Sequence, residues 1–193
     1  MLGLKLPTDP RWVNLAALQI EDILTDHAYC EQKATTNCIS IIQSYPEFQQ
    51  VVAALIPLVT EEWGHFKLVV EALEKRNLKL GFQRKDEYVN KLFEHTKKGS
   101  NRPAQLVERL LFSALIEARS CERFKLLSLE INDAELRQFY KMLMISEAGH
   151  YKLFLELAMT IHPKEVVMKR WEEYLAYEAE ILQEIALRGD RIH

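Results

Sequence analysis

A seven-residue segment that pairs a carboxylate with an imidazole occurs twice in this chain. Residues 62–68 read EWGHFKL and residues 147–153 read EAGHYKL, so five of the seven positions are identical. On a helix, positions three apart lie on one face, which places each Glu beside its His. Each copy also has a Gly before the His, where Ala would favour a helix by about 1 kcal/mol. The repeat therefore indicates a duplicated site.

Two further carboxylates occur at matching distances before the repeated segments. Glu31 precedes Glu62 by 31 residues, and Glu117 precedes Glu147 by 30. At about 1.5 Å per helical residue, such a spacing returns the chain to the same height in a bundle. Each half of the chain then supplies a Glu and a Glu-x-x-His pair, as in bundles that bind two metal ions. The predicted metal ligands are Glu31, Glu62, His65, Glu117, Glu147 and His150.

Glu122 is an alternative to Glu117, because both have apolar neighbours at helical spacing. Glu117 lies 86 residues after Glu31 and Glu122 lies 91 after it, so Glu117 fits the duplication better. Four carboxylates and two imidazoles form a hard, oxygen-rich set that suits iron or manganese. Structural zinc sites favour thiolates, and the three cysteines (Cys30, Cys38 and Cys121) lie off the ligand pattern.

The composition is typical of one globular domain without a membrane span. Its 193 residues are 48% hydrophobic and 27% charged, which allows a proper core but is short for two domains. We therefore expect a single domain over residues 1–193. Three cysteines without Cys-x-x-Cys spacing favour a reducing compartment. There is no run of 18 apolar residues and no secretion signal, so we expect a cytoplasmic protein without a membrane partner.

Apolar periodicity and capping signals predict an all-helical chain. The expected long helices cover residues 10–45, 44–77, 101–130, 132–161 and 163–189, with a short helix at 86–97. Short turns make antiparallel hairpins of helices one and two and of helices three and four. The long link between helices two and three permits a crossover. These features predict a ferritin-like four-helix bundle with a long crossover between helices 2 and 3 and a C-terminal fifth helix.

Several segments resemble the non-haem di-iron tRNA hydroxylase family. They are LPTDPRW at residues 6–12, LTDH at 24–27, CEQKA at 30–34 and the two Glu-x-Gly-His segments. The resemblance extends over essentially the whole chain. It implies hydroxylation of the isopentenyl group of 2-methylthio-N6-isopentenyladenosine, the modified base beside the anticodon. It also implies two Fe ions on the same six ligands, O2 as co-substrate, and electrons from an external reductase, an electron-transfer protein.

The predicted crossover is strongly basic. Residues 75–102 contain nine Lys or Arg and three acidic residues, although the chain has a net charge of −3. A local cationic cluster can bind a polyanion, and a tRNA anticodon stem-loop presents phosphates and unstacked bases. The predicted tRNA contacts are Lys75, Arg76, Lys79, Arg84, Lys85, Lys97, Lys98 and Arg102. If these form an ordinary solvated surface, the RNA site is expected among Arg109, Arg119, Arg123 and Lys125.

Two other functions fit parts of the pattern. Another ferritin-like di-metal enzyme, such as a ferroxidase, a peroxidase or a manganese catalase, would use the same ligands. A non-catalytic helical RNA-binding module would explain the basic crossover. A pure binding protein has no need of six converging polar groups, so the ligand pattern favours an enzyme.

Overall fold

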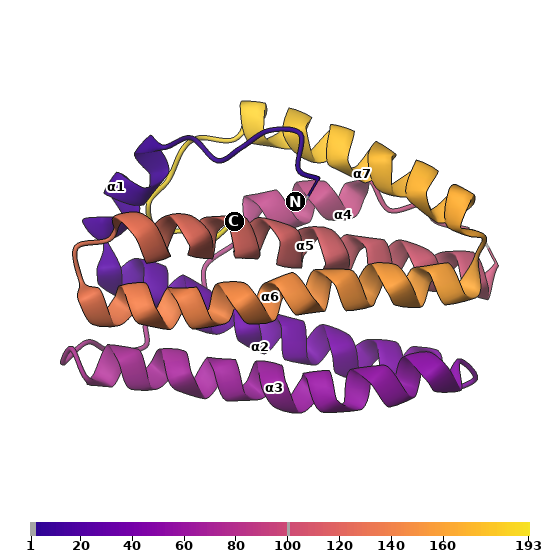
Figure 1. The fold of residues 1–193 in the computed structure, drawn as a ribbon, viewed down its shortest axis with the longest axis horizontal. Coiled ribbons are helices and arrows are strands. Elements are labelled where there is room, and N and C mark those ends of the chain that lie inside the picture. The colour runs from indigo at the N-terminus through magenta and orange to yellow at the C-terminus, as the bar shows by residue number, and fades with distance from the viewer. Residues whose placement is uncertain (1–2, 100) are drawn as a thin grey trace. The chain divides into compact units, whose positions relative to one another are not determined.

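A computed structural model describes residues 3–99 and 101–193, and all regular structure within these residues is helical (Figure 1). The helices are α1 Arg11–Ala17, α2 Ile20–Ser44, α3 Gln49–Glu74, α4 Glu87–Glu94, α5 Arg102–Glu130, α6 Ala134–Ile161 and α7 Lys164–Glu184. Over the described residues, no helix combines the length and the apolar character that a membrane crossing requires.

The chain forms two compact units. The α2–α3 unit consists of residues 10–85 and 188–192, and the α5–α6 unit consists of the N-terminal segment up to residue 9, residues 86–187 and residue 193. Each unit contains one of the two predicted helical hairpins. The expectation of a single domain over residues 1–193 stays a prediction.

In the α2–α3 unit, two long helices pack along their apolar stripes. Leu24 and Ala28 of α2 are fully buried, as are Leu55 and Val69 of α3. The apolar positions recur at the helical period, which gives each helix one face to bury. The four-residue turn between Ser44 and Gln49 reverses the chain, so the two helices run antiparallel (Figure 1).

Two predicted helix boundaries in this unit are wrong. The single helix expected over residues 10–45 is broken, because Gln19 adopts φ −131° and ψ 48°, outside the helical region. The break lets α1 turn Trp12 and Ala16 into the core, and Leu18 is left 82% exposed. The helix expected over residues 44–77 starts later than predicted, because α3 begins at Gln49 after the turn.

In the α5–α6 unit, the predicted helix starts agree closely with the structure. The side chains of Asp86, Asn101 and Asp133 accept hydrogen bonds from the amides of Val89, Ala104 and Leu136. Such caps satisfy amides that have no partner inside the helix. The ends are predicted less well, since α7 stops at Glu184 and not at residue 189.

A buried ion pair joins α7 to α5 within this unit. The Arg119 guanidinium donates two hydrogen bonds to Glu178, Nε to Oε1 at 2.7 Å and Nη2 to Oε2 at 2.9 Å. Both side chains are fully buried. Arg119 also donates to the Leu6 carbonyl oxygen and the Thr8 hydroxyl, so it secures the N-terminal segment as well.

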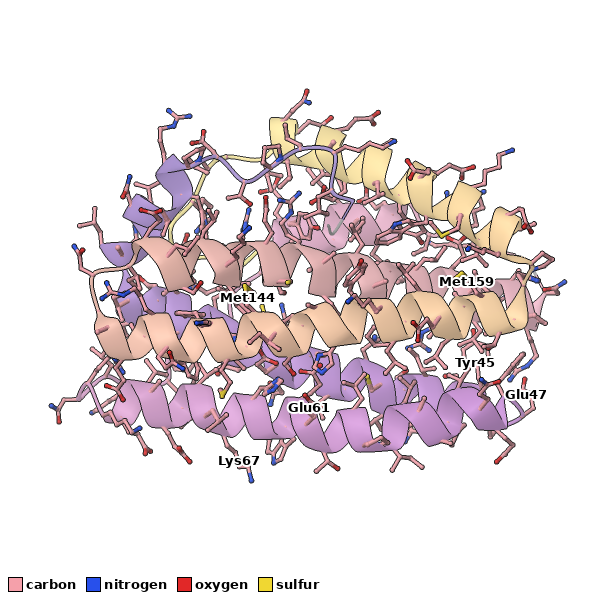
Figure 2. The ribbon with its side chains drawn as sticks, in the orientation of Figure 1. Tyr45, Glu47, Glu61, Lys67, Met144 and Met159 are labelled. Atoms are coloured by element: carbon pink, nitrogen blue, oxygen red, sulfur yellow. The ribbon has the colours of Figure 1, made fainter. Side chains whose placement is uncertain are left out.

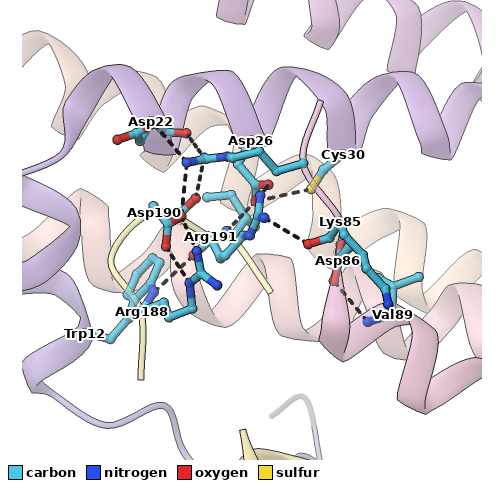
Figure 3. Close-up of polar contacts among 12 residues, drawn as sticks. Trp12, Asp22, Asp26, Cys30, Lys85, Asp86, Val89, Arg188, Asp190 and Arg191 are labelled. Atoms are coloured by element: carbon cyan, nitrogen blue, oxygen red, sulfur yellow. Dashed lines mark hydrogen bonds and ion pairs between the residues drawn. The ribbon is translucent and has the colours of Figure 1, made fainter. Parts of the chain in front are cut away.

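The last residues of the α2–α3 unit form a C-terminal strap, residues 188–192 (Figure 3). Arg191 Nη1 donates to Asp26 Oδ1 at 2.7 Å, and the Ile192 amide donates to Asp26 Oδ2 at 2.8 Å. The Trp12 indole donates to the Arg191 carbonyl oxygen at 3.1 Å. The strap therefore binds both α1 and α2.

Gly189 lies too close to α1 to accept a side chain. A Cβ at this position would lie 2.3 Å from the carbonyl carbon of Leu15, a backbone atom that cannot swing aside. We therefore expect Gly189→Ala to lower the free energy of unfolding by about 1–3 kcal/mol, the usual effect of overpacking. Denaturant unfolding followed by circular dichroism measures the change.

Gly149 provides a matched control for this substitution. No atom lies within 4 Å of a Cβ built on Gly149, which is inside α6. Gly149→Ala should raise the free energy of unfolding by about 1 kcal/mol through helix propensity. Equal effects of the two substitutions would contradict a packing role for Gly189.

Candidate metal centre

The α2–α3 unit contains the first ligand cluster, formed by Glu31, Glu62 and His65. All three side chains are buried. His65 Nδ1 lies 3.4 Å from Glu62 Oε2 and 3.6 Å from Glu31 Oε2. One ligand atom from each residue lies within 4.8 Å of the others, a spacing that could hold one metal ion. The hairpin turn brings Glu31 of α2 level with the Glu-x-x-His pair of α3, as the sequence spacing predicts.

The α5–α6 unit contains the second ligand cluster, formed by Glu117, Glu147 and His150. These side chains are also buried. His150 Nδ1 lies 3.3 Å from Glu147 Oε2, and one ligand atom from each of the three residues lies within 4.8 Å of the others. In both clusters, Nδ1 is the imidazole nitrogen that faces the carboxylates. Each copy of the sequence repeat therefore forms one cluster of two carboxylates and one imidazole, within its own hairpin.

The donor set of each cluster fits a divalent metal ion. Two carboxylates and one imidazole are a hard, oxygen-rich set that suits iron or manganese. Removing two carboxylates from water is costly unless a cation compensates their charge. Each cluster could thus bind metal through the residues that the repeat predicted.

The structure separates Glu117 from its alternative, Glu122. The Glu122 carboxylate accepts hydrogen bonds from the Thr8 amide at 3.0 Å and from the Thr8 hydroxyl at 2.6 Å. It also forms an ion pair with Arg119. Glu122 is thus bound to the N-terminal segment, while Glu117 shares a cluster with Glu147 and His150. The spacing of the sequence repeat thus predicted Glu117, the carboxylate that lies beside Glu147 and His150.

Three side chains around the clusters were missed by the sequence analysis. His27 Nε2 lies 2.7 Å from Glu31 Oε1. In each cluster, the residue four positions before the His lies near its Nε2 atom: Glu61 Oε1 lies 3.9 Å from His65 Nε2, and Ser146 Oγ lies 3.3 Å from His150 Nε2. Glu61 lies on α3 (Figure 2). A search for polar residues four positions before each ligand would have found all three. Such outer partners orient ligands and fix the imidazole tautomer.

Cys121 lies near the second cluster but is not suited to metal binding. Burial first, and then the charge of Glu147, raises the pKa of the Cys121 thiol to about 11. The thiol therefore stays protonated at neutral pH, and a protonated thiol is a poor ligand. Its Sγ lies 3.3 Å from the Met144 carbonyl oxygen. Cys121 belongs to none of the groups of described residues that could hold a metal ion.

The predicted tRNA contacts are in different environments. Arg84 lies in the α2–α3 unit between Asp22 and Asp190, with Nη1–Oδ distances of 2.8 and 3.0 Å. Lys97 lies 3.2 Å from Glu173, and Lys98 lies 5.9 Å from the centre of the Phe93 ring. Arg76 is half-buried and donates to the carbonyl oxygen of residue 72. The remaining four are exposed: Lys75, Lys79, Lys85 and Arg102.

The alternative RNA site on α5 was predicted at Arg109, Arg119, Arg123 and Lys125. The structure contradicts this prediction at two of the four positions. Arg119 and Arg123 are buried, and Arg119 is held by Glu178. Neither guanidinium can reach a phosphate at the surface. Both guanidinium groups instead donate to partners inside the α5–α6 unit, Arg119 to Glu178 and Arg123 to the Thr8 hydroxyl.

A family model described as tRNA-(MS[2]IO[6]A)-hydroxylase (MiaE) matches residues 2–193 of the chain. The chain belongs to this family. The resemblance predicted from the sequence motifs is thereby confirmed.

Two relatives of the chain are named tRNA 2-(methylsulfanyl)-N(6)-isopentenyladenosine(37) hydroxylase. The Pseudomonas putida protein is 33% identical over 177 residues, which cover 92% of this chain and 85% of that protein. The Salmonella typhimurium protein is 25% identical over an alignment 237 positions long, and this alignment covers 97% of this chain and 85% of that protein. Both alignments thus cover nearly the whole of this chain.

A solved structure supports the predicted fold class. The structure of protein 43 from Synechococcus, with aldehyde deformylating oxygenase activity, has a TM-score of 0.92 and 32% sequence identity to this chain. The similarity covers 98% of this chain and 94% of that one. The all-α, ferritin-like fold class predicted for this member of the hydroxylase family is confirmed.

Proposed function

We propose that this protein hydroxylates the isopentenyl group of 2-methylthio-N6-isopentenyladenosine next to the anticodon of tRNA. The observation that carries the proposal is the family match over residues 2–193. The two relatives named as hydroxylases of this nucleoside support the same substrate. Because tRNA is the substrate, we place the enzyme in the cytoplasm.

The proposed cofactor is a di-iron centre held by the six predicted ligands. The first cluster would supply Glu31, Glu62 and His65, and the second would supply Glu117, Glu147 and His150. Each imidazole would bind through Nδ1, the nitrogen that faces the carboxylates of its own cluster. When bound in the reduced form, two iron ions supply electrons that split dioxygen.

The proposed reaction replaces one C–H bond of the isopentenyl group by a C–OH bond. One oxygen atom of O2 enters the substrate and the other leaves as water. Two electrons and two protons complete the balance, and an external electron-transfer protein is proposed to deliver the electrons. The chain contributes a dry environment, because Leu110, Leu115, Phe124 and Phe154 are buried along α5 and α6. Excluding water protects a strong oxidant from side reactions.

The basic residues at 75–102 are proposed to bind tRNA by its phosphates. The exposed lysines and Arg102 support this role better than Arg84, whose guanidinium already contacts two carboxylates. Phosphate contacts release counterions, so tRNA affinity should fall as salt rises.

Changing Lys97, Lys98 and Arg102 together to Ala should weaken tRNA binding and flatten its salt dependence. Each lost phosphate contact should reduce the slope of log affinity against log salt by about one unit. Iron content should stay unchanged, because none of the three is a proposed ligand. Filter binding at several salt concentrations measures the slope. If the triple variant bound tRNA with wild-type affinity and wild-type salt slope, the proposal that these three residues contact tRNA phosphates would be contradicted.

Another di-metal oxygenase activity is the second candidate. Protein 43, which matches 98% of the chain at 32% identity, has aldehyde deformylating oxygenase activity. Mass spectrometry of tRNA nucleosides from cells with and without this chain separates the candidates. Hydroxylated nucleoside only in cells that contain the chain supports the proposal. Unchanged nucleosides, together with conversion of a long-chain aldehyde by the purified protein, would favour the alternative.

A further inference from the structure

Each helical hairpin supplies the same kinds of proposed ligand, a Glu followed by a Glu-x-x-His pair. The hairpins differ in the residue four positions before the first of these glutamates, Glu31 or Glu117. In the α2–α3 hairpin this residue is His27, which is fully buried and lies 2.7 Å from Glu31 through Nε2. In the α5–α6 hairpin it is Ser113, whose hydroxyl donates to the Arg109 carbonyl oxygen at 2.9 Å. The first hairpin thus has a buried imidazole on its Glu, where the second has a hydroxyl directed at its own helix.

His27 divides the two oxygens of the Glu31 carboxylate between different partners. Oε1 lies against His27 Nε2, whereas Oε2 lies 3.6 Å from Nδ1 of His65, on the side of the ligand cluster. An ionised carboxylate only accepts hydrogen bonds, so the Nε2–H group of His27 is the donor. With Oε1 engaged in this way, one oxygen of Glu31 remains directed at the cluster.

We infer that His27 is a positioning residue that holds Oε1 of Glu31 and leaves Oε2 turned toward the ligand cluster, so that the two hairpins would offer unlike carboxylates to the two iron ions. The inference rests on the proposed di-iron centre. A hydrogen bond from an outer imidazole restrains the rotation of a ligand carboxylate. The corresponding residue of the α5–α6 hairpin, Ser113, has no imidazole, and its hydroxyl donates to the Arg109 carbonyl oxygen.

The surroundings of His27 support a fixed orientation. The neighbouring residue, Asp26, is buried and accepts hydrogen bonds from Arg191 Nη1 and the Ile192 amide of the C-terminal strap (Figure 3). Arg191 Nη2 also donates to the Lys85 carbonyl oxygen at 2.8 Å. The strap therefore anchors the turn of α2 that contains His27, and full burial keeps the imidazole from turning toward solvent.

Anaerobic titration of the metal-free protein with Fe²⁺ tests this role in His27→Ala, His27→Gln and Ser113→Ala. We expect His27→Ala to bind one of two irons about 10–100-fold more weakly, the usual effect of losing an outer partner. Mössbauer spectra of the ferrous protein should show one altered iron and one unaltered iron. His27→Gln should restore binding, because its amide can also donate to Glu31. Ser113→Ala, at the corresponding position, should match the wild type.

Two results would overturn the inference. One is wild-type iron affinity and wild-type spectra in His27→Ala. The other is an equal loss at both irons that His27→Gln does not restore, which would show that His27 only supports the fold. The titration contains no tRNA, so it is separate from the test of the proposed function. A protein whose His27 variants behave as expected but which leaves tRNA unmodified would refute the hydroxylase proposal alone.

Discussion

Replacing Glu117 by Ala should remove most of the iron from the purified protein and abolish hydroxylation. The wild type should contain about two irons per chain, as di-metal carboxylate bundles do. Glu117 is buried in one cluster with Glu147 and His150, so its loss removes a negative charge and a ligand atom together. Iron analysis of the reconstituted protein, normalised to protein concentration, measures the effect.

Glu122→Ala is the matched control on the same helix. Its carboxylate binds Thr8 and Arg119 and belongs to no ligand cluster. This variant should keep its iron, although its stability should fall because Arg119 loses a partner. Full iron in Glu117→Ala, with loss in Glu122→Ala, would reverse the assignment of the α5 ligand.

Glu178→Ala should produce the largest loss of stability among the substitutions considered. Removing one partner of a buried ion pair costs about 3–5 kcal/mol when the other charge is left uncompensated. Arg119 keeps a second carboxylate partner, Glu122, so the loss should lie near the lower end of this range. Arg119 would be left fully buried without the two hydrogen bonds that join α5 to α7. Urea unfolding of the metal-free protein, followed by circular dichroism, measures the free energy without a contribution from iron binding.

Glu172→Ala is the control for a solvent-exposed pair on α7. Glu172 lies 3.2 Å from Lys5, and both side chains are largely exposed. Exposed pairs contribute about 0–1 kcal/mol, so this variant should unfold close to the wild type. A loss in Glu178→Ala no larger than that in Glu172→Ala would contradict the proposed role of the buried pair.

The sequence predicted the two helical hairpins, the grouping of two carboxylates with one imidazole in each, and the family, because these features depend on local spacing. Glu62 and His65 are three apart on one helix, and one hairpin turn brings Glu31 level with them. The same rule, applied to the second copy, selected Glu117 over Glu122. Periodicity likewise predicted the buried stripes of α5 and α6.

Features that depend on long-range packing were not predicted. The break at Gln19 follows from the burial of Trp12, which contacts a strap 179 residues away in sequence. Gly189 was expected to end a helix, but its role is to let the strap approach Leu15. Arg119 was a candidate for RNA binding until the structure placed Glu178 against it. Each of these contacts joins distant segments, and local patterns do not encode them.

Hydroxylation of purified tRNA under isotopically labelled dioxygen is the most direct test of the proposed function. The iron-loaded protein would be reduced chemically, mixed with tRNA that contains 2-methylthio-N6-isopentenyladenosine, and exposed to heavy-oxygen O2. Mass spectrometry of the digested tRNA should then show a hydroxylated nucleoside that contains the heavy isotope. An unmodified nucleoside, or a hydroxyl group with the isotope of the solvent water, would contradict the proposal.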